Sequence, residues 1–274
     1  MSQIFGGAAL LFCPADRPDR FSKAAAAADM VILDLEDAVP AERKAQARAN
    51  LTAHPLDPAT VIVRVNAARS ADYAEDIAAL RRTDYRWVML PKAEDPREID
   101  ALAGCQVIAL CETARGVVNA GQLAHAPGTR ALMWGAEDLM ASLGGGTSRL
   151  PDGTYRHIST HARATVLLHA AAAGIGAVDA VYLDTEDAEG LALEAEDAAS
   201  SGFIAKACIH PRQANVVRQA FMPSYEDVQW ARRVLSASRT EGAVFVLDGQ
   251  MIDAPLLRQA EHLMRRSQAD HPVR

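Results

Sequence analysis

The sequence predicts a barrel of eight parallel β-strands, each followed by an α-helix, and three observations support this fold class. Short apolar segments alternate with amphipathic segments, which is the pattern of parallel β-α units. Eight such units fit within about the first 220 residues, the arithmetic of a (β/α)8 TIM barrel. The first strand-to-helix turn, CPADRPDRF, contains no glycine, whereas an open doubly wound sheet usually has a glycine-rich phosphate turn there.

The predicted strands are short, apolar and not strictly alternating, as expected for strands that are buried on both faces. They are residues 8–13, 30–35, 61–65, 87–91, 107–111, 131–135, 180–184 and 203–209. Helices are predicted between and after them, at residues 19–28, 40–52, 71–82, 95–103, 116–125, 158–173, 188–201 and 211–220. The short connections between these segments are typical of β-α units.

Residues 222–274 form a predicted C-terminal extension of the barrel domain, which occupies residues 1–221. Ser224 is placed to cap a helix that begins just after Pro223. A short strand, a turn at Asp248-Gly249 and a long amphipathic helix follow. We interpret the extension as part of the same domain, acting as a lid or an oligomer contact.

Composition excludes several classes of function. The 274 residues carry a net charge of −7 and no basic block, which argues against a nucleic-acid partner. No apolar run approaches the roughly 20 residues that span a membrane, and no signal peptide is recognisable. The four cysteines form no CxxC pair, so we interpret them as reduced core thiols of a cytoplasmic protein.

Polar and charged side chains lie at the end of every one of the eight predicted strands, either within its last residues or just after them. The carboxyl ends of barrel strands meet at one mouth, where barrel enzymes have their active sites. We therefore expect these side chains to converge. In strand order they are Asp16 and Arg17; Glu36 and Asp37; Arg64 and Asn66; Lys92; Glu112, Thr113 and Arg115; Glu137 and Asp138; Asp184 and Asp187; and His210.

Carboxylates that converge at one mouth repel one another, and a bound divalent cation would relieve the repulsion. Oxygen ligands suit Mg²⁺, which typically binds one or two protein carboxylates plus substrate oxygens. Glu112 and Asp138 are the best pair, because they follow adjacent strands and the two cleanest apolar runs. Arg64 could neutralise a substrate carboxylate or an enolate oxygen.

The alternative for any single carboxylate is a structural role, as a helix cap or as the partner of Arg64 or Lys92. This alternative is strongest for Asp34 and Asp184, which interrupt apolar runs. The recurrence of charged groups at all eight strand ends argues against it for the set as a whole.

Other motifs carry less information. The segment SLGGGTSR at residues 142–149 lacks the lysine and the spacing of a P-loop, so we interpret it as a flexible active-site loop. His157 and His161 share a helix face without an HExxH motif, which favours a surface or packing role. His210 precedes Pro211, which fits a structural turn as well as a catalytic role. No GxSxG motif supports a serine hydrolase.

Several segments, in order along nearly the whole chain, resemble those of citrate lyase β-subunit-like proteins, within the superfamily of HpcH/HpaI aldolases and malyl-CoA lyases. They are LFCPADRPDRF, VILDLEDAV, VRVN, VMLPKAE, CETARG, WGAEDL, CIHPRQ and GQMIDAP. The resemblance implies a Mg²⁺-dependent lyase, usually a homotrimer or hexamer. Such an enzyme cleaves or forms the carbon–carbon bond of a 3-hydroxyacyl-CoA, such as malyl-CoA or citramalyl-CoA. The products are an acetyl-CoA-type thioester and a 2-oxo acid.

The resemblance also implies roles for residues at the barrel mouth. Glu112 and Asp138 match the metal ligands. Arg64 matches the arginine that steadies the oxo-acid or enolate oxygen. Glu36 and Asp37 belong to the acidic motif after the second strand, with a catalytic role or a water-mediated link to the metal.

Substrate and coenzyme contacts follow from the same resemblance. Arg17 and Lys92 would contact the phosphates or pantetheine of coenzyme A. Asp253 matches a C-terminal aspartate that reaches a neighbouring subunit's site in relatives, and it is the candidate base. The substrate itself would contact the WGAEDL motif through Ala136, Glu137 and Asp138.

Two features depart from many citrate lyase β-subunits. Gly6 and Gly7 precede the first strand, and CPADRP replaces a glycine-containing form. Both resemble a short stand-alone subgroup and favour a CoA thioester. The alternatives are a thioesterase or malate-synthase-like activity on the same esters, and a citrate lyase β-subunit acting on a carrier-bound citryl thioester. A further alternative is an aldolase that acts on a free 2-oxo acid and an aldehyde without CoA. A non-enzymatic carrier-binding scaffold is disfavoured, because it would not need the full set of carboxylates.

Overall fold

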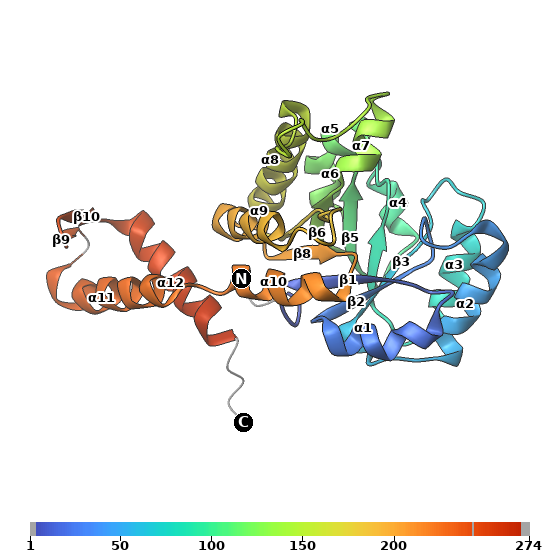
Figure 1. Ribbon diagram of the computed structural model, residues 1–274, viewed down its shortest axis with the longest axis horizontal. Helices are drawn as coiled ribbons and strands as arrows, with labels where there is room; N and C mark the ends of the chain where they lie inside the picture. The colour runs from blue at the N-terminus through green and yellow to red at the C-terminus, as the bar shows by residue number, and fades with distance from the viewer. Residues whose placement is uncertain (1–3, 243, 270–274) are drawn as a thin grey trace. The chain divides into compact units, whose positions relative to one another are not determined.

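The computed structural model describes residues 4–242 and 244–269 of the chain. One compact unit ends at Arg218 and a second begins at Gln219. The first unit is a closed barrel whose eight strands follow one another in chain order (Figure 1). Every neighbouring pair, including the closing pair of first and last strands, is parallel. The predicted (β/α)8 barrel is therefore confirmed.

The barrel strands are four to six residues long and almost entirely buried. They are β1 (Ala9–Pro14), β2 (Met30–Asp34), β3 (Val61–Arg64), β4 (Trp87–Leu90), β5 (Gln106–Cys111), β6 (Thr129–Trp134), β7 (Gly176–Asp179) and β8 (Ala205–Cys208). Continuous burial explains why their sequences are apolar runs without alternation.

Helices follow the strands and cover the outside of the barrel (Figure 1). They are α1 (Phe21–Ala27), α2 (Lys44–Ala53), α3 (Tyr73–Leu80), α4 (Arg97–Asp100), α5 (Ala114–Val118), α6 (Ala120–Ala124), α7 (Ala136–Ser142), α8 (His157–Ala172), α9 (Ala188–Ser201) and α10 (Pro211–Phe221). Three short 3-10 turns precede α1, α2 and β3, at η1 (Pro18–Arg20), η2 (Ala41–Arg43) and η3 (Pro58–Thr60). In the described part of the chain, no helix is both long enough and apolar enough to cross a membrane.

The seventh strand lies earlier in the chain than the sequence predicts. The prediction of residues 180–184 is wrong, because β7 ends at Asp179. The strand consists of small residues, and at Gly176 an added Cβ would lie 2.4 Å from Ile204 Cδ1. The more apolar residues that follow form a loop, in which Tyr182 Oη donates to Asp187 Oδ2 over 2.5 Å.

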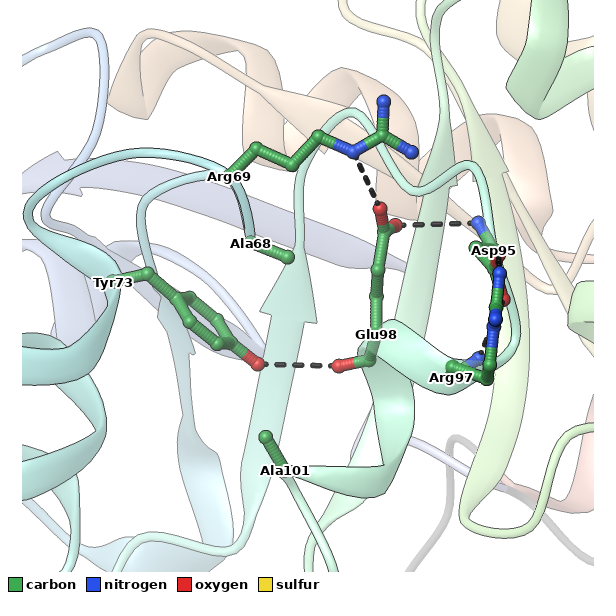
Figure 2. Close-up of a pocket in the computed structure, with 7 residues that line it drawn as sticks. All are labelled: Ala68, Arg69, Tyr73, Asp95, Arg97, Glu98 and Ala101. Atoms are coloured by element: carbon green, nitrogen blue, oxygen red, sulfur yellow. Dashed lines mark hydrogen bonds and ion pairs between the residues drawn. The ribbon is translucent and has the colours of Figure 1, made fainter.

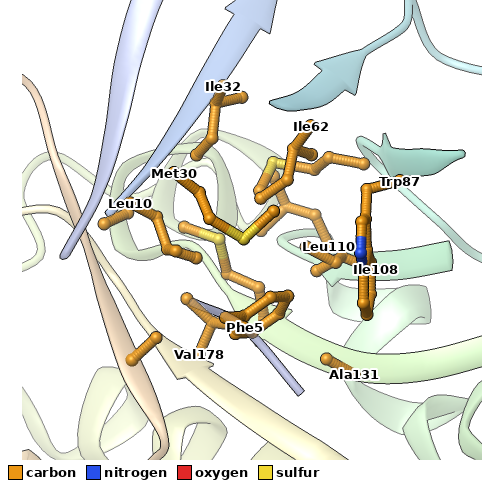
Figure 3. Close-up of a cluster of buried hydrophobic side chains, with 14 residues drawn as sticks. Phe5, Leu10, Met30, Ile32, Ile62, Trp87, Ile108, Leu110, Ala131 and Val178 are labelled. Atoms are coloured by element: carbon orange, nitrogen blue, oxygen red, sulfur yellow. The ribbon is translucent and has the colours of Figure 1, made fainter. Parts of the chain in front are cut away.

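Side chains that point into the barrel alternate along each strand with side chains that face the helices. Asp34 and Arg64 lie two residues beyond core residues of β2 and β3, so they share the inward face. Asp179 and Lys206 lie next to core residues and face outward. The inner core (Figure 3) consists of Phe5, Leu10, Met30, Ile32, Ile62, Trp87, Met89, Ile108, Leu110, Ala131, Met133, Val178, Ala205 and Ala207.

The second unit pairs two helices with a two-stranded hairpin: α11 (Tyr225–Glu241), β9 (Phe245–Leu247), β10 (Gln250–Ile252) and α12 (Ala254–Ala269). The Ser224 cap is confirmed, since Ser224 Oγ accepts from the Asp227 N–H at 3.0 Å within a full capping box. On one hairpin face Phe245 and Ile252 are buried. The last five residues of the predicted extension lie outside the described residues, and its role as a lid or oligomer contact stays a prediction.

Candidate active site

An ion pair between β2 and β3 lies at the base of the site, and the register of the two strands brings its partners together. Asp34 and Arg64 are direct neighbours in the β2–β3 pairing. Arg64 Nε donates to Asp34 Oδ1 at 2.7 Å, and Nη2 donates to Oδ2 at 2.6 Å. The guanidinium also stacks over the Phe12 ring, 4.8 Å from its centroid. Burial opposes the charge on Arg64, but the neighbouring carboxylates outweigh it and raise its pKa. Arg64 is therefore a fixed cation with one amino group, Nη1, turned away from Asp34.

Glu36 lies against that remaining amino group. Its Oε2 is 3.1 Å from Arg64 Nη1. The two are misaligned for a hydrogen bond, and this oxygen has no hydrogen-bond partner among the described residues. Its other oxygen, Oε1, accepts from Lys92 Nζ at 2.7 Å. Burial raises the pKa of Glu36, more than its two cationic neighbours lower it. A buried carboxylate oxygen without a donor marks a position where a ligand could bind.

Lys92 joins four carboxyl groups of the site. Its backbone N–H donates to Glu112 Oε1 at 3.0 Å. Its ammonium lies 2.7 Å from Glu36 Oε1, 3.2 Å from Asp37 Oδ2 and 3.5 Å from Asp138 Oδ1. Burial disfavours the charge, but the bond to Glu36 and the other carboxylates raise the pKa of Lys92. The lysine predicted to contact coenzyme A thus lies among acidic side chains.

Glu112 follows β5 and is only 3% exposed. Burial is the main reason that its pKa rises to about 8, with the charges of Asp138 and Glu36 adding to the effect. Gly135, at the end of β6, makes room for it, because an added Cβ there would lie 2.7 Å from Glu112 Oε2. The buried strand VIALC therefore ends by holding a carboxyl group that resists ionisation while no cation is bound.

Asp138 and Glu137 lie in the first turn of α7, a helix that the sequence did not reveal. Asp138 faces the Lys92 ammonium. Glu137 Oε1 accepts from Ser148 Oγ at 2.6 Å. Ser148 is buried, and Arg156 N donates to its carbonyl oxygen at 2.9 Å. The segment at residues 142–149, predicted to be a flexible loop, is thus anchored at Ser148.

The residues fit a divalent cation held by Glu112 and Asp138. In residues 4–242 and 244–269, no three histidine, cysteine or acidic side chains form a metal-binding group. Mg²⁺ does not need three, because it keeps several waters and takes oxygens from its substrate. The Glu36 oxygen that lacks a hydrogen bond and the raised pKa of Glu112 both indicate excess negative charge at this mouth. A divalent cation would relieve that excess.

Six of the predicted strand-end residues are connected by these contacts: Glu36, Asp37, Arg64, Lys92, Glu112 and Asp138. Other predicted groups have structural partners. Arg17 forms an exposed ion pair with Asp19 at 2.9 Å. Asp184 Oδ1 accepts from the N–H of Glu186 at 2.9 Å, and Asp187 caps α9.

The three histidines singled out in the sequence are structural or exposed. His157 and His161 are exposed on α8, as predicted. His210 Nδ1 accepts from the Arg212 N–H at 3.2 Å at the start of α10. The thiols of Cys13, Cys111 and Cys208 are buried and free, and burial raises their pKa.

Asp253, the predicted base, belongs to the second unit. It precedes α12, where its Oδ1 lies 3.4 Å from the Leu256 nitrogen. Its catalytic role stays a prediction.

Sequence reasoning missed Lys44 and Asp76, which hold the loops after β2 and β3 through the predicted residue Asn66. Lys44 Nζ donates to the Leu35 carbonyl at 2.8 Å, to the Glu36 carbonyl at 3.1 Å and to Asn66 Oδ1 at 2.6 Å. Asn66 Nδ2 donates to Asp76 Oδ2 at 2.7 Å. The sequence held one sign that polar contacts form in this region, namely the charged residue Asp34 within an apolar run. The sequence favoured a structural role for it.

A separate cavity of about 390 Å³ lies between the segments that follow β3 and β4 (Figure 2). Its charged side chains neutralise one another. Arg69 Nε is 3.2 Å from Glu98 Oε1, and Arg97 pairs with Asp95. Tyr73 Oη donates to the Glu98 carbonyl at 3.2 Å. The remaining lining residues are Ala68 and Ala101, and none of the six connected site residues lines this cavity.

A second buried charge network lies on the outer face of the barrel. Lys206 Nζ donates to Asp179 Oδ2 at 2.9 Å and to Glu194 Oε1 at 2.8 Å. Arg163 Nε donates to Asp179 Oδ1 at 2.9 Å, and Arg149 Nη2 donates to Glu194 Oε2 at 2.6 Å. Burial would raise the pKa of Asp179, but its two cations outweigh burial and lower it. The carboxylates and cations of this network therefore pair with one another.

Comparison with known proteins identifies close relatives. Residues 8–211 match the HpcH/HpaI aldolase/citrate lyase family. The chain is 55% identical over 261 residues to a citrate lyase subunit beta-like protein of Mycobacterium tuberculosis, covering 95% of this chain and 96% of the relative. It is 32% identical over 290 residues to human mitochondrial citramalyl-CoA lyase, covering 93% and 83%.

A solved structure agrees with this assignment. The crystal structure of CitE from Mycobacterium tuberculosis in complex with magnesium, acetoacetate and coenzyme A matches with a TM-score of 0.93 at 54% identity. The match covers 97% of this chain and 99% of that one.

Proposed function

The chain belongs to the HpcH/HpaI aldolase/citrate lyase family, and from this premise we propose that it is a Mg²⁺-dependent lyase of CoA thioesters. It is a carbon–carbon lyase, as its relatives are. The proposed reaction cleaves or forms the carbon–carbon bond of a 3-hydroxyacyl-CoA of the malyl-CoA or citramalyl-CoA type. The products are an acetyl-CoA-type thioester and a 2-oxo acid.

The observation that carries the proposal is the acidic mouth beside a fixed arginine. Glu112 and Asp138 would hold the ion, which when bound supplies a Lewis acid for the oxygens of the 2-oxo acid. The M. tuberculosis relatives crystallised with magnesium and with pyruvate, acetoacetate or oxaloacetate support this assignment.

Arg64 would bind the substrate oxygen on which negative charge develops. Asp34 occupies Nε and Nη2, so Nη1 is the donor left for substrate. A donor held in place before the reaction stabilises developing charge without reorganising. Glu36 Oε2 lies 3.1 Å from that amino group and is buried. Its position supports a role for Glu36 in taking the proton of the substrate hydroxyl during cleavage.

The other assignments complete the proposal. Ala136 and Glu137 would contact the substrate beside Asp138, and Asp37 would act through water. Arg17 would contact coenzyme A, whereas the carboxylate contacts of Lys92 support a role at the metal site instead. In the direction of bond formation, Asp253 of a neighbouring subunit would remove the proton from the acyl-CoA α-carbon.

The proposal includes a homo-oligomer, a trimer or hexamer, in the cytoplasm. The outer face of the β9–β10 hairpin supports an oligomer contact. Val246 and Met251 are direct neighbours in the pairing and are 71% and 60% exposed. An exposed apolar pair beside Asp253 suits a surface that another subunit covers. Light scattering coupled to size-exclusion chromatography would measure the subunit number.

A cleavage assay tests the function. The panel would hold malyl-CoA, β-methylmalyl-CoA, citramalyl-CoA and 3-hydroxy-3-methylglutaryl-CoA, with the carbonyl product and free thiol measured separately. We expect a carbonyl product that EDTA abolishes. Free thiol without carbonyl product would assign a thioesterase instead. Neither product would point to a carrier-bound citryl thioester, as used by citrate lyase β-subunits.

Site variants test the assignment of the ligands. Glu112→Ala and Asp138→Ala should each lower turnover by about 10³-fold, because a catalytic metal contributes several kcal/mol. Asp184→Asn is the matched control, since Asp184 follows β7 but only caps a turn. Turnover that survives either alanine substitution would refute the assignment.

A further inference from the structure

Lys92 adopts a backbone conformation that is unusual for its residue type. Its φ is +50°, in the left-handed region where glycine is the unstrained choice. This conformation lets one residue direct its N–H to Glu112 and its side chain to three further carboxylates. A glycine would make the first contact without strain but could make none of the others. The strain is therefore retained for the ammonium group, which indicates a role for that group.

The contacts of the ammonium are unequal. The distance to Glu36 Oε1, 2.7 Å, is that of a strong charge-assisted hydrogen bond. The distance to Asp138 Oδ1, 3.5 Å, is that of an ion pair without a hydrogen bond. Lys92 is held firmly by Glu36 and more loosely by Asp138. Its side chain is 31% exposed, so it has room to move away from Asp138.

The mouth needs a cation in the metal-free protein. Glu36, Asp37, Glu112 and Asp138 converge on Lys92, and Glu36 Oε2 lacks a hydrogen-bond donor among the described residues. Arg64 pairs with Asp34 and with Glu36. Lys92 is the cation that reaches Asp138 in this structure, and Asp138 is also a ligand that the proposed Mg²⁺ would use.

We propose that Lys92 is the resident counter-cation of this metal site. Its ammonium neutralises Asp138 and its neighbours while no metal is bound, and a divalent ion must displace it from Asp138 to bind. Lys92 therefore stabilises the metal-free fold and weakens metal binding to the free enzyme. As a consequence, tight binding of the metal requires oxygens from the substrate. The inference rests on the proposed function, because the ion is the one assigned to Glu112 and Asp138.

Lys92→Gly tests the inference with little risk of misfolding. Glycine accepts the positive φ and keeps the N–H that binds Glu112, so the variant removes only the ammonium and its stem. Lys92→Met preserves the bulk of the side chain, and Lys92→Arg preserves the charge. Lys23→Met, on the exposed face of α1, is the matched control for loss of a positive charge.

The measurement is the affinity of the EDTA-stripped full chain for Mn²⁺ alone, from the electron paramagnetic resonance signal of free Mn²⁺. We expect Lys92→Gly and Lys92→Met to bind Mn²⁺ about tenfold more tightly than wild type, a gain of about 1.4 kcal/mol. Lys92→Arg and Lys23→Met should bind as wild type does. Without metal, the melting temperature of Lys92→Met should fall, and Mg²⁺ should restore more of it than in wild type.

The outcomes separate this inference from the proposed function. If wild type binds Mn²⁺ but Lys92→Gly and Lys92→Met bind it equally or more weakly, Lys92 orients the ligands and the counter-cation role is wrong. If wild type and both variants bind no Mn²⁺, the proposed metal site fails together with the inference. Tighter binding in both variants supports both.

Discussion

Two acid–base pairs each link neighbouring strands of this barrel but have different surroundings. Asp34 and Arg64 are register neighbours at the ends of β2 and β3, and Asp179 and Lys206 are register neighbours in β7 and β8. The first pair points into the barrel and the second faces the helices, because strand residues alternate between the two faces. Each pair is the centre of a buried charge network.

The outer network is balanced. Its carboxylates Asp179, Glu194 and Asp197 are matched by the cations Lys206, Arg163 and Arg149. The Trp134 Nε1–H adds a hydrogen bond to Asp179 at 2.7 Å. At the mouth, five carboxyl groups share two cations, Arg64 and Lys92, among the residues that the structure describes. A balanced buried network stabilises a fold, whereas an unbalanced one is arranged for a ligand that completes it.

The largest effect is expected in the outer network, where Lys206→Met removes a cation that is fully buried. The fully buried Asp179 and the half-buried Glu194 would each lose one of their two cations. The free energy of unfolding should fall by about 3–5 kcal/mol, the typical cost of breaking a buried ion pair. Urea denaturation would measure it, with Lys23→Met as control.

A double variant sharpens this test. Asp179→Asn combined with Lys206→Met should cost less than the sum of the two single changes, because no unpaired charge of the pair is left. If the changes in the free energy of unfolding are additive, Asp179 and Lys206 do not stabilise each other, and the charges of the outer network do not pair as the structure shows.

At the mouth, the stability of the metal-free protein should depend on pH. Burial and neighbouring carboxylates raise the pKa of Glu112 from 4.5 to about 8. The folded state then binds more protons than the unfolded state between these values, so stability falls as pH rises through this window. For each pKa unit by which the folded state differs from the unfolded state, the free energy of unfolding changes by about 1.4 kcal/mol.

Thermal melts in EDTA across that pH range would measure the slope. Glu112→Gln should abolish most of it, and Mg²⁺ should reduce it in wild type. A wild-type melting temperature that stays constant or rises across the window would show that Glu112 is ionised in the metal-free protein.

Asp34→Asn breaks the inner pair without changing its size. Arg64 keeps Glu36 as a neighbour but loses the carboxylate that fixes Nε and Nη2. We expect kcat/KM for the cleaved thioester to fall by about 10–100-fold, as for other residues that orient a catalytic group. Asp179→Asn, in the outer pair, is the matched control and should change stability but not kcat. Equal kinetic losses in both variants would contradict the comparison.

The smallest effect is expected at Ser148, which links α7 to the anchored segment before α8. Ser148→Ala removes the hydrogen bond to Glu137 Oε1. The free energy of unfolding should fall by about 1 kcal/mol. A few-fold rise in KM would follow from the looser first turn of α7. Unchanged stability and KM would mean that Glu137 is held by other contacts.

The barrel could be predicted because it depends on local patterns. Buried runs such as VIALC, and caps such as Ser224, show their structure in a few consecutive residues. The seventh strand could not, because β7 is made of small residues and a more apolar segment lies beside it. Helix α7 was missed because it begins directly after β6 and lasts only seven residues.

The site was predicted in outline, since strand ends must meet in a barrel. Its internal pairing could not be predicted. Lys92 and Glu36 are 56 positions apart in sequence, and no local pattern indicates that they bind each other. The inward direction of Asp34 depends on the register between β2 and β3, which three-dimensional structure alone reveals.

Gly135 offers a practical tool for studying any chain of this type. A methyl group at this position would collide with Glu112 Oε2 at 2.7 Å and Glu112 Cβ at 2.9 Å. Gly135→Ala would therefore force the Glu112 side chain to move, with every charged residue still present. Such a charge-neutral variant separates the effect of moving the Glu112 carboxyl group from the effect of removing its charge.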